Sequence, residues 1–200
     1  MNKSNPTEGE IVFDVDYPEM KASIMSSIYP KEVAMKFKGA NTSSDFSTGM
    51  VSMVNVANYD RKEVVQLLKF LTDKKAAVYN QSIIDSTILS DAKYTIIKVN
   101  GEKEVAGYKC KKAILTIGNS EKFEVYYTQE INAKNCNWWS PFKEIDGMLM
   151  EYHVIKYGIH MHLKAREVKT EPIENDQFLL PKDYKKISVV EMDGIFNSLK

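Results

Sequence analysis

The fold class follows first from one stretch of alternating residues, IVFDVDY at positions 11–17. In an extended chain its apolar and aromatic residues would share one face, while the two aspartates would point to the other. The stretch is therefore predicted to be a half-buried β-strand.

The same two-residue period returns along the first half of the chain. Short runs of Gly, Asn, Asp and Thr, which favour turns, separate strands predicted near 32–38, 42–47, 50–57, 63–71 and 75–80. Asn100-Gly101 is predicted to be a two-residue type I′ hairpin turn, because both residues tolerate positive φ. Two further hairpins are predicted to turn at Gly118-Asn119 and near Tyr157-Gly158.

Helical spacing of apolar residues is confined to two segments. One runs from about 19 to 28, and the other follows Pro181, where Ser188 and Glu191 have the spacing of a capping box. Residues 129–147 have neither period and are predicted to form a long ordered loop. About eleven strands with two or three helices predict a mainly β fold, in which helices cover one face of a single large, curved antiparallel sheet.

Composition bounds the domain count and the partners. A chain of 200 residues fits one domain, and we expect residues 1–9 to be disordered or trimmed and residues 10–200 to form a single β-rich domain. Lys plus Arg and Asp plus Glu both number 27, so no long-range field favours nucleic acid as a partner. No stretch approaches the roughly 20 apolar residues that span a bilayer. The polar start lacks a signal-peptide core, which leaves either a cytoplasmic protein or one whose export signal was removed.

Familiar catalytic motifs are missing from the sequence. It contains no Gly-x-Ser-x-Gly elbow, no His-Glu-x-x-His helix, no P-loop and no Gly-x-Gly-x-x-Gly turn, and no cofactor is expected. Cys110 and Cys136 are too far apart for a Cys-x-x-Cys site, and the pair is open to two interpretations, a disulfide or two thiols.

The three histidines permit a sharper expectation. If the chain turns at residues 157–158, His153 faces His162 across the hairpin and His160 lies on the same face, close enough for the three to bind a transition metal. A bulged register would place His153 on the opposite face. Apolar segregation favours the first register, because it collects the hairpin's apolar residues on one side. An ordinary solvated strand face is the competing interpretation, so no metal is expected at these candidate residues.

Ten methionines are the other departure from an ordinary composition. Flexible thioethers suit an adaptable apolar pocket, and they also fill irregular cores. The candidate pocket residues are Met35, Phe37, Met53, Tyr152 and Met161. Trp138-Trp139 in the predicted loop is either an exposed contact or a group that packs the loop against the sheet.

Four segments, taken in order, carry a resemblance to a known family. They are VAGYKCKKA at 105–113, YYTQEI at 126–131, EIDGMLMEY at 144–152 and FLLPKDYK at 178–185. In these segments the chain resembles a family of uncharacterised secreted bacterial proteins named for a Gly-Leu-Pro-Gly-Leu-Ile motif. The stretch that would match this motif, residues 145–150, contains no proline.

The resemblance implies an exported protein in the periplasm, at the outer membrane or outside the cell. It also implies a fold similar to the bacterial lipoprotein carriers, an unclosed β-barrel whose concave face can hold acyl chains. The leading hypothesis is thus a non-enzymatic exported protein that binds a lipid-like or other hydrophobic molecule. The alternatives are a structural or protein-interaction module of the cell envelope and a hydrolase with an unrecognised site.

Overall fold

The computed structural model describes residues 5–20, 29–49, 51–88, 94–118, 121–156 and 158–198. These residues form twelve strands and five helical elements. The strands are β1 (Glu8–Asp16), β2 (Glu32–Lys38), β3 (Asn41–Asp45), β4 (Val51–Asn58), β5 (Glu63–Phe70), β6 (Asp73–Asn80), β7 (Tyr94–Val105), β8 (Tyr108–Ile117), β9 (Glu121–Thr128), β10 (Met148–Lys156), β11 (Ile159–Lys169) and β12 (Lys185–Lys186). The helical elements are η1 (Pro18–Met20), α1 (Gln81–Ile83), η3 (Ile84–Ile88), η4 (Asn175–Phe178) and α2 (Val189–Asn197).

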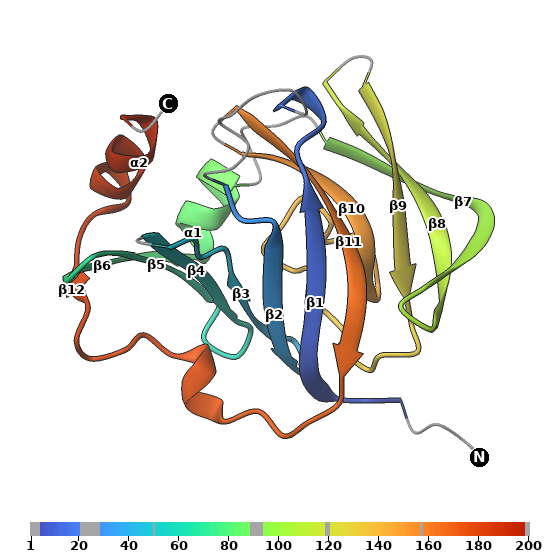
Figure 1. Cartoon of the computed structure of the whole chain (residues 1–200), viewed down its shortest axis with the longest axis horizontal. Helices are drawn as coiled ribbons and strands as arrows, with labels where there is room; N and C mark the ends of the chain where they lie inside the picture. The colour runs from blue at the N-terminus through green and yellow to red at the C-terminus, as the bar shows by residue number, and fades with distance from the viewer. Residues whose placement is uncertain are drawn as a thin grey trace.

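All twelve strands belong to one sheet, which confirms the predicted mainly β fold. Their order is β12-β6-β5-β4-β3-β2-β1-β11-β10-β9-β8-β7, with every pair antiparallel except the short parallel pair of β12 and β6 (Figure 1). The two ends of this order, β12 and β7, are not joined, so the sheet is curved but unclosed. β1 begins at Glu8, two residues before the predicted start of the domain.

Alternating apolar residues explain most of the strands. β2 to β6 lie within a few residues of their predicted positions, and Ser188 caps α2 as predicted, accepting a hydrogen bond from the backbone N–H of Glu191 at 3.1 Å. The hairpins β8–β9 and β10–β11 are also confirmed by the pairs Ile117 with Glu121 and Lys156 with Ile159. Their turn residues 119 and 157, and residues 21–28 of the predicted first helix, lie outside the described residues.

The predicted turn at Asn100-Gly101 is wrong. The chain turns instead at Ala106-Gly107, whose φ angles of 49° and 79° are both positive, and Gly101 lies in an irregularity inside β7. The observed register places Glu102 opposite Lys111 and Glu104 opposite Lys109. A turn at residues 100–101 would instead have set Lys98 against Lys103. Opposite charges across a strand pair stabilise it and like charges do not, so pairing outweighs the local turn preference.

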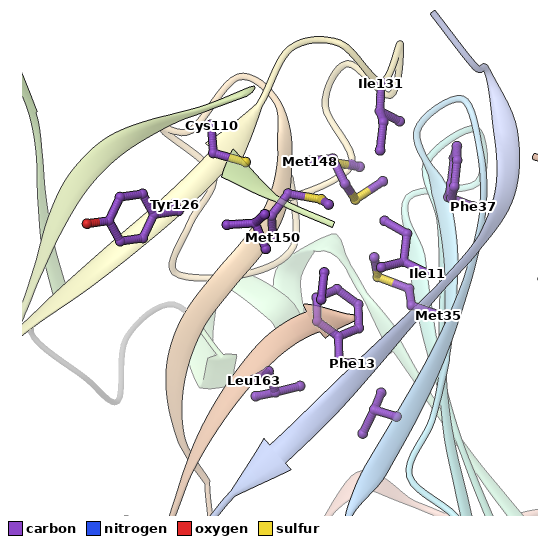
Figure 2. Close-up of a cluster of buried hydrophobic side chains, with 14 of the residues drawn as sticks. Ile11, Phe13, Met35, Phe37, Cys110, Tyr126, Ile131, Met148, Met150 and Leu163 are labelled. Carbon is purple, nitrogen blue, oxygen red and sulfur yellow. The ribbon is translucent and has the colours of Figure 1, made fainter. Parts of the chain in front are cut away.

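The core fills the concavity of the sheet. Ile11, Phe13, Phe37, Met150 and Leu163 are 0% exposed, and they pack together with residues of β8, β9 and the loop after β9 (Figure 2). At the other end of the sheet, strands β4 to β6 are covered on both faces. Met192 of α2 packs on one face, and Ile173 and Phe178 of the segment before β12 pack on the other.

The segment between β9 and β10 is an ordered loop without a strand or helix, as predicted. Asn137 is 7% exposed, and its side-chain amide donates to the carbonyl oxygens of Ile145 at 2.9 Å and Gly147 at 2.8 Å. Trp138 and Trp139 are partly buried against the cluster of β4, β5, β6 and α2. The tryptophans therefore pack the loop against the sheet.

Candidate functional site

The β10–β11 hairpin brings the three histidines together. The register pairs His153 with His162 and Ile155 with His160, which is the register predicted from apolar segregation. On the other side of the hairpin, Tyr152, Val154, Ile159, Met161 and Leu163 contact the hydrophobic core. Alternation along both strands therefore leaves the imidazoles on the side of the hairpin that faces away from these residues.

The three rings are in direct contact. Nδ1 of His153 lies 2.9 Å from Nε2 of His160 and shares a hydrogen bond with it. The His153 and His162 rings are stacked, with centroids 4.3 Å apart and planes 9° from parallel. Phe123 of β9 stacks on His153 at 4.6 Å between centroids and meets His160 edge-on at 4.9 Å. The cluster thus contains four aromatic rings in contact, three from β10 and β11 and one from β9.

Two carboxylates flank this stack. Glu151 Oε1 lies 3.3 Å from Nε2 of His162, and Glu19 of η1 lies 3.4 Å from Nδ1 of His160. Glu151 is only 12% exposed in its side chain and also accepts from Lys103 Nζ at 2.6 Å. Lys103 belongs to β7, three strands away in the sheet order, so β7 must curl back over β10 to make this contact.

The electrostatics of the stack centre on His153. Burial is the main cause that lowers the pKa of His153 to about 4, and the neighbouring His162 and His160 contribute because a second positive charge beside them would be repelled. The central imidazole is consequently neutral at pH 7. Among the residues that the structure describes, the carboxylates of Glu19 and Glu151 contact His160 and His162, not His153.

The metal interpretation of these histidines gains no support from the geometry. Among the residues that the structure describes, no group of three or more His, Cys, Asp or Glu side chains could hold a metal ion. Metal–nitrogen distances of about 2 Å require nitrogens that converge on one point. Here His153 and His162 lie face to face, and the facing nitrogens of His153 and His160 hydrogen bond to each other.

Four of the five candidate pocket residues pack in the core. Met35 and Phe37 are 8% and 0% exposed, and Tyr152 and Met161 pack against the same core cluster. Met53 is only partly buried and accepts a weak hydrogen bond from Gln66 at 3.9 Å. Side chains occupy the space in which the hypothesis placed a ligand (Figure 2). Four methionines, Met35, Met148, Met150 and Met192, are buried core residues, which favours the second of the two interpretations above.

The two cysteines are also core residues and are held as free, buried thiols. Burial raises the pKa of the Cys110 thiol to about 11 and that of Cys136 to about 12, which leaves both protonated at neutral pH. The disulfide interpretation is not realised in this structure. A protonated, buried thiol is a poor nucleophile, so neither cysteine offers catalytic chemistry.

A polar groove of about 300 Å³ opens where the loop leaves β9 and returns to β10. Gln129 is fixed at both ends of its amide: Oε1 accepts from Lys111 Nζ at 2.7 Å and Nε2 donates to the Asp146 carbonyl at 3.1 Å. Asn132, Lys134 and Asp146 are exposed, whereas Ile131, which also lines the groove, is only 2% exposed. Planar amides and a carboxylate suit a ligand rich in hydroxyl or amide groups.

The sequence analysis missed the residues that contact the three histidines and also those that line the polar groove, for different reasons. Glu151 stands two residues before His153 on the same strand, so alternation could have placed it on the histidine face. Glu19 and Phe123 come from distant segments, and the groove joins the two ends of a loop that has no periodicity. Nothing in the sequence of these segments indicates such contacts.

A family comparison identifies the chain's relatives. The family described as N-glycanase peptide, N-terminal domain, matches residues 38–141, just over half of the chain. The chain belongs to this family. No curated protein matches it.

Solved structures of PNGF-II agree with this N-glycanase N-terminal family in fold. The structure of PNGF-II in the P21 space group superposes with a TM-score of 0.62 at 18% identity, over 95% of this chain and 33% of that chain. The structure in the C2 space group gives 0.60 at 16% identity, over 94% and 32%. The chain spans about one third of the length of these PNGF-II chains.

These findings correct the earlier assignments. The family resemblance drawn from four short segments is wrong, because the matching family is that of the N-glycanase N-terminal domain. The lipid-carrier hypothesis fails with it, since the matching family is that of an N-glycanase domain and core side chains fill the concave face. No helix of the described residues is long and apolar enough to cross a membrane.

Proposed function

We propose that the chain is a glycan-recognition domain of the N-glycanase type, which binds glycans linked to asparagine or the peptides that carry them. The observation that carries the proposal is the match of residues 38–141 to the N-glycanase N-terminal domain. An N-glycanase acts on N-linked glycans, and a domain that makes up about a third of such a protein is suited to a binding role beside a separate catalytic part. Export from the cell belongs to the same proposal.

The polar groove beside the loop 129–147 is the proposed contact surface. Sugars present hydroxyl and acetamido groups that both donate and accept hydrogen bonds. The side-chain amides of Gln129 and Asn132 can likewise donate through nitrogen and accept through oxygen. Because Lys111 and the Asp146 backbone already orient the Gln129 amide, little side-chain entropy is lost on binding. The groove also draws most of its lining from the segment that the family model matches.

Calorimetric titration of the purified chain with an asparagine-linked glycopeptide tests the proposal. We expect saturable binding that is weakened at least tenfold in an Asn132→Ala/Lys134→Ala variant, whose exposed positions lie in the groove. Lys31→Ala is the matched control, because Lys31 is an exposed lysine of a different groove. Absence of binding at millimolar glycopeptide, or equal loss in the control, would refute the proposal.

Hydrolysis is a second candidate, favoured by the imidazole–carboxylate contacts of His162 with Glu151 and His160 with Glu19. Paired groups of this kind can transfer protons in the cleavage of an amide. Release of the glycan from the same glycopeptide, followed by mass spectrometry, measures this activity directly. Release that persists in Glu151→Gln would exclude the cluster as its source.

A further inference from the structure

The three-histidine cluster joins three separate parts of the fold. The hairpin β10–β11 supplies the imidazoles, β9 supplies Phe123, and η1 supplies Glu19. The central ring of these contacts, His153, is neutral at pH 7. A change in ring charge therefore acts on the contact between the three elements at once.

The hydrogen-bond arrangement treats the three rings differently. Protonated His160 could donate from Nδ1 to Glu19 and from Nε2 to His153, and protonated His162 could donate from Nε2 to Glu151. Each of these charges has a carboxylate as its partner. A charge on His153 would instead meet the stacked rings of His162 and Phe123 and the Nε2 atom of His160.

The side chains that face His153 come from its own strand and from the two strands beside it, β9 and β11. His160 and His162 face it from β11, Glu151 lies on its own strand, and β9 contributes the uncharged Phe123 ring. Further out, Lys103 of β7 holds Glu151, and Asp16 of β1 is paired with His162 in the sheet. Because Lys103 already engages the Glu151 carboxylate, that charge is less able to compensate a proton on His153.

We propose that this cluster is an acid-sensitive contact, in which the β10–β11 hairpin is docked against β9 and η1 while His153 is neutral and separates from them when His153 binds a proton. When His160 and His162 are both protonated, His153 can only accept the hydrogen bond from His160, and a proton on His153 would also set two charged rings 4.3 Å apart in the stack with His162. A proton on His153 then opposes both contacts, while the strands on the far side of the sheet carry no part of the cluster. The opening is therefore local.

Hydrogen exchange between pH 7 and pH 4, corrected for the intrinsic rate, tests the proposal on the whole chain. We expect opening of residues 151–156 and 159–163 to rise by up to about tenfold for each pH unit below 6, as expected for one proton taken up on opening. Amides of β4 and β5 report global unfolding and should stay better protected than those of residues 151–156 and 159–163 throughout this range, because the opening is local.

His153→Phe supplies the matched variant, because a phenyl ring can stack on Phe123 and His162 but cannot be protonated. We expect its exchange at residues 159–163 to be flat with pH. Carbon-bound imidazole proton resonances of the wild type provide a readout that does not depend on this variant folding, and His153 should titrate together with the opening. Wild-type protection that is unchanged down to pH 4, or an equal rise in His153→Phe, would overturn the proposal.

Discussion

The loop that borders the groove depends on one buried amide, and Asn137→Ala measures that dependence. The Asn137 side chain donates to the carbonyl oxygens of Ile145 and Gly147 at 2.9 and 2.8 Å. Each hydrogen bond contributes about 1 kcal/mol net. Of the two carbonyls, that of Gly147 also accepts from the Cys136 thiol at 3.7 Å, so the Ile145 carbonyl is the one left without a partner, which costs about a further 1 kcal/mol. We therefore expect the free energy of unfolding to fall by about 3 kcal/mol, a large share of the 5–15 kcal/mol typical of a domain.

Asn137→Asp sharpens the test because it keeps the shape of the side chain. Its carboxylate would face the same two carbonyl oxygens, so at pH 7 the loss in stability should exceed that of Asn137→Ala. Below the carboxyl pKa the protonated side chain can donate one hydrogen bond, and part of the loss should be recovered. Urea denaturation gives both values, and hydrogen exchange of residues 129–147 locates the effect. A loss below about 1 kcal/mol in Asn137→Ala, or an Asp variant as stable as wild type, would refute the reasoning.

Three other expectations follow from the same structure. In Gly147→Ala a Cβ would lie 2.6 Å from the Thr128 carbonyl oxygen at a φ of 152°, so β10 must shift against β9 and the midpoint of thermal unfolding should drop. Met150→Ala removes a fully buried side chain and should cost about 2–5 kcal/mol in urea denaturation, whereas an exposed methionine of a ligand pocket would cost little. The pKa of His153 is lowered to about 4 from an unfolded value near 6.5, so the unfolded state binds more protons; stability should fall by up to about 2 kcal/mol between pH 7 and pH 5, and His153→Phe should remove this slope.

The strands and the hairpin register were accessible from the sequence, because burial on one face leaves a period of two residues that can be read directly. In β10–β11 this pattern decided between two registers and so located all three histidines correctly. The β7–β8 turn was not accessible in this way. Asn100-Gly101 is a strong local signal, but the register that sets Glu102 opposite Lys111 and Glu104 opposite Lys109 exists only across strands.

Only part of the candidate site could be predicted from the sequence, for a physical reason. Residues that act together on one hairpin, such as His153 and His162, are related by pairing. Phe123 lies on β9, the sheet neighbour of β10, and Glu19 follows β1, the sheet neighbour of β11. The pairing of β1 with β11 joins strands that are far apart in the sequence and leaves no local pattern. The function hypothesis failed for another reason, since short motif similarities and methionine content were both compatible with an ordinary filled core.

A filled concavity constrains where this domain can bind a partner. Ile11, Phe13 and Phe37 are 0% exposed at the centre of the sheet, and α2 covers the strands β4 to β6. A ligand that entered there would have to displace packed apolar side chains, at a cost comparable to a core mutation. Binding at the loop 129–147 requires no such displacement, because its polar groups already face the solvent beside the ends of β9 and β10. The Asn137 hydrogen bonds connect two parts of this loop, and the two tryptophans pack it against the sheet, so its polar groups are presented on a rigid support. That support would lower the conformational entropy that the protein loses on binding the proposed glycan.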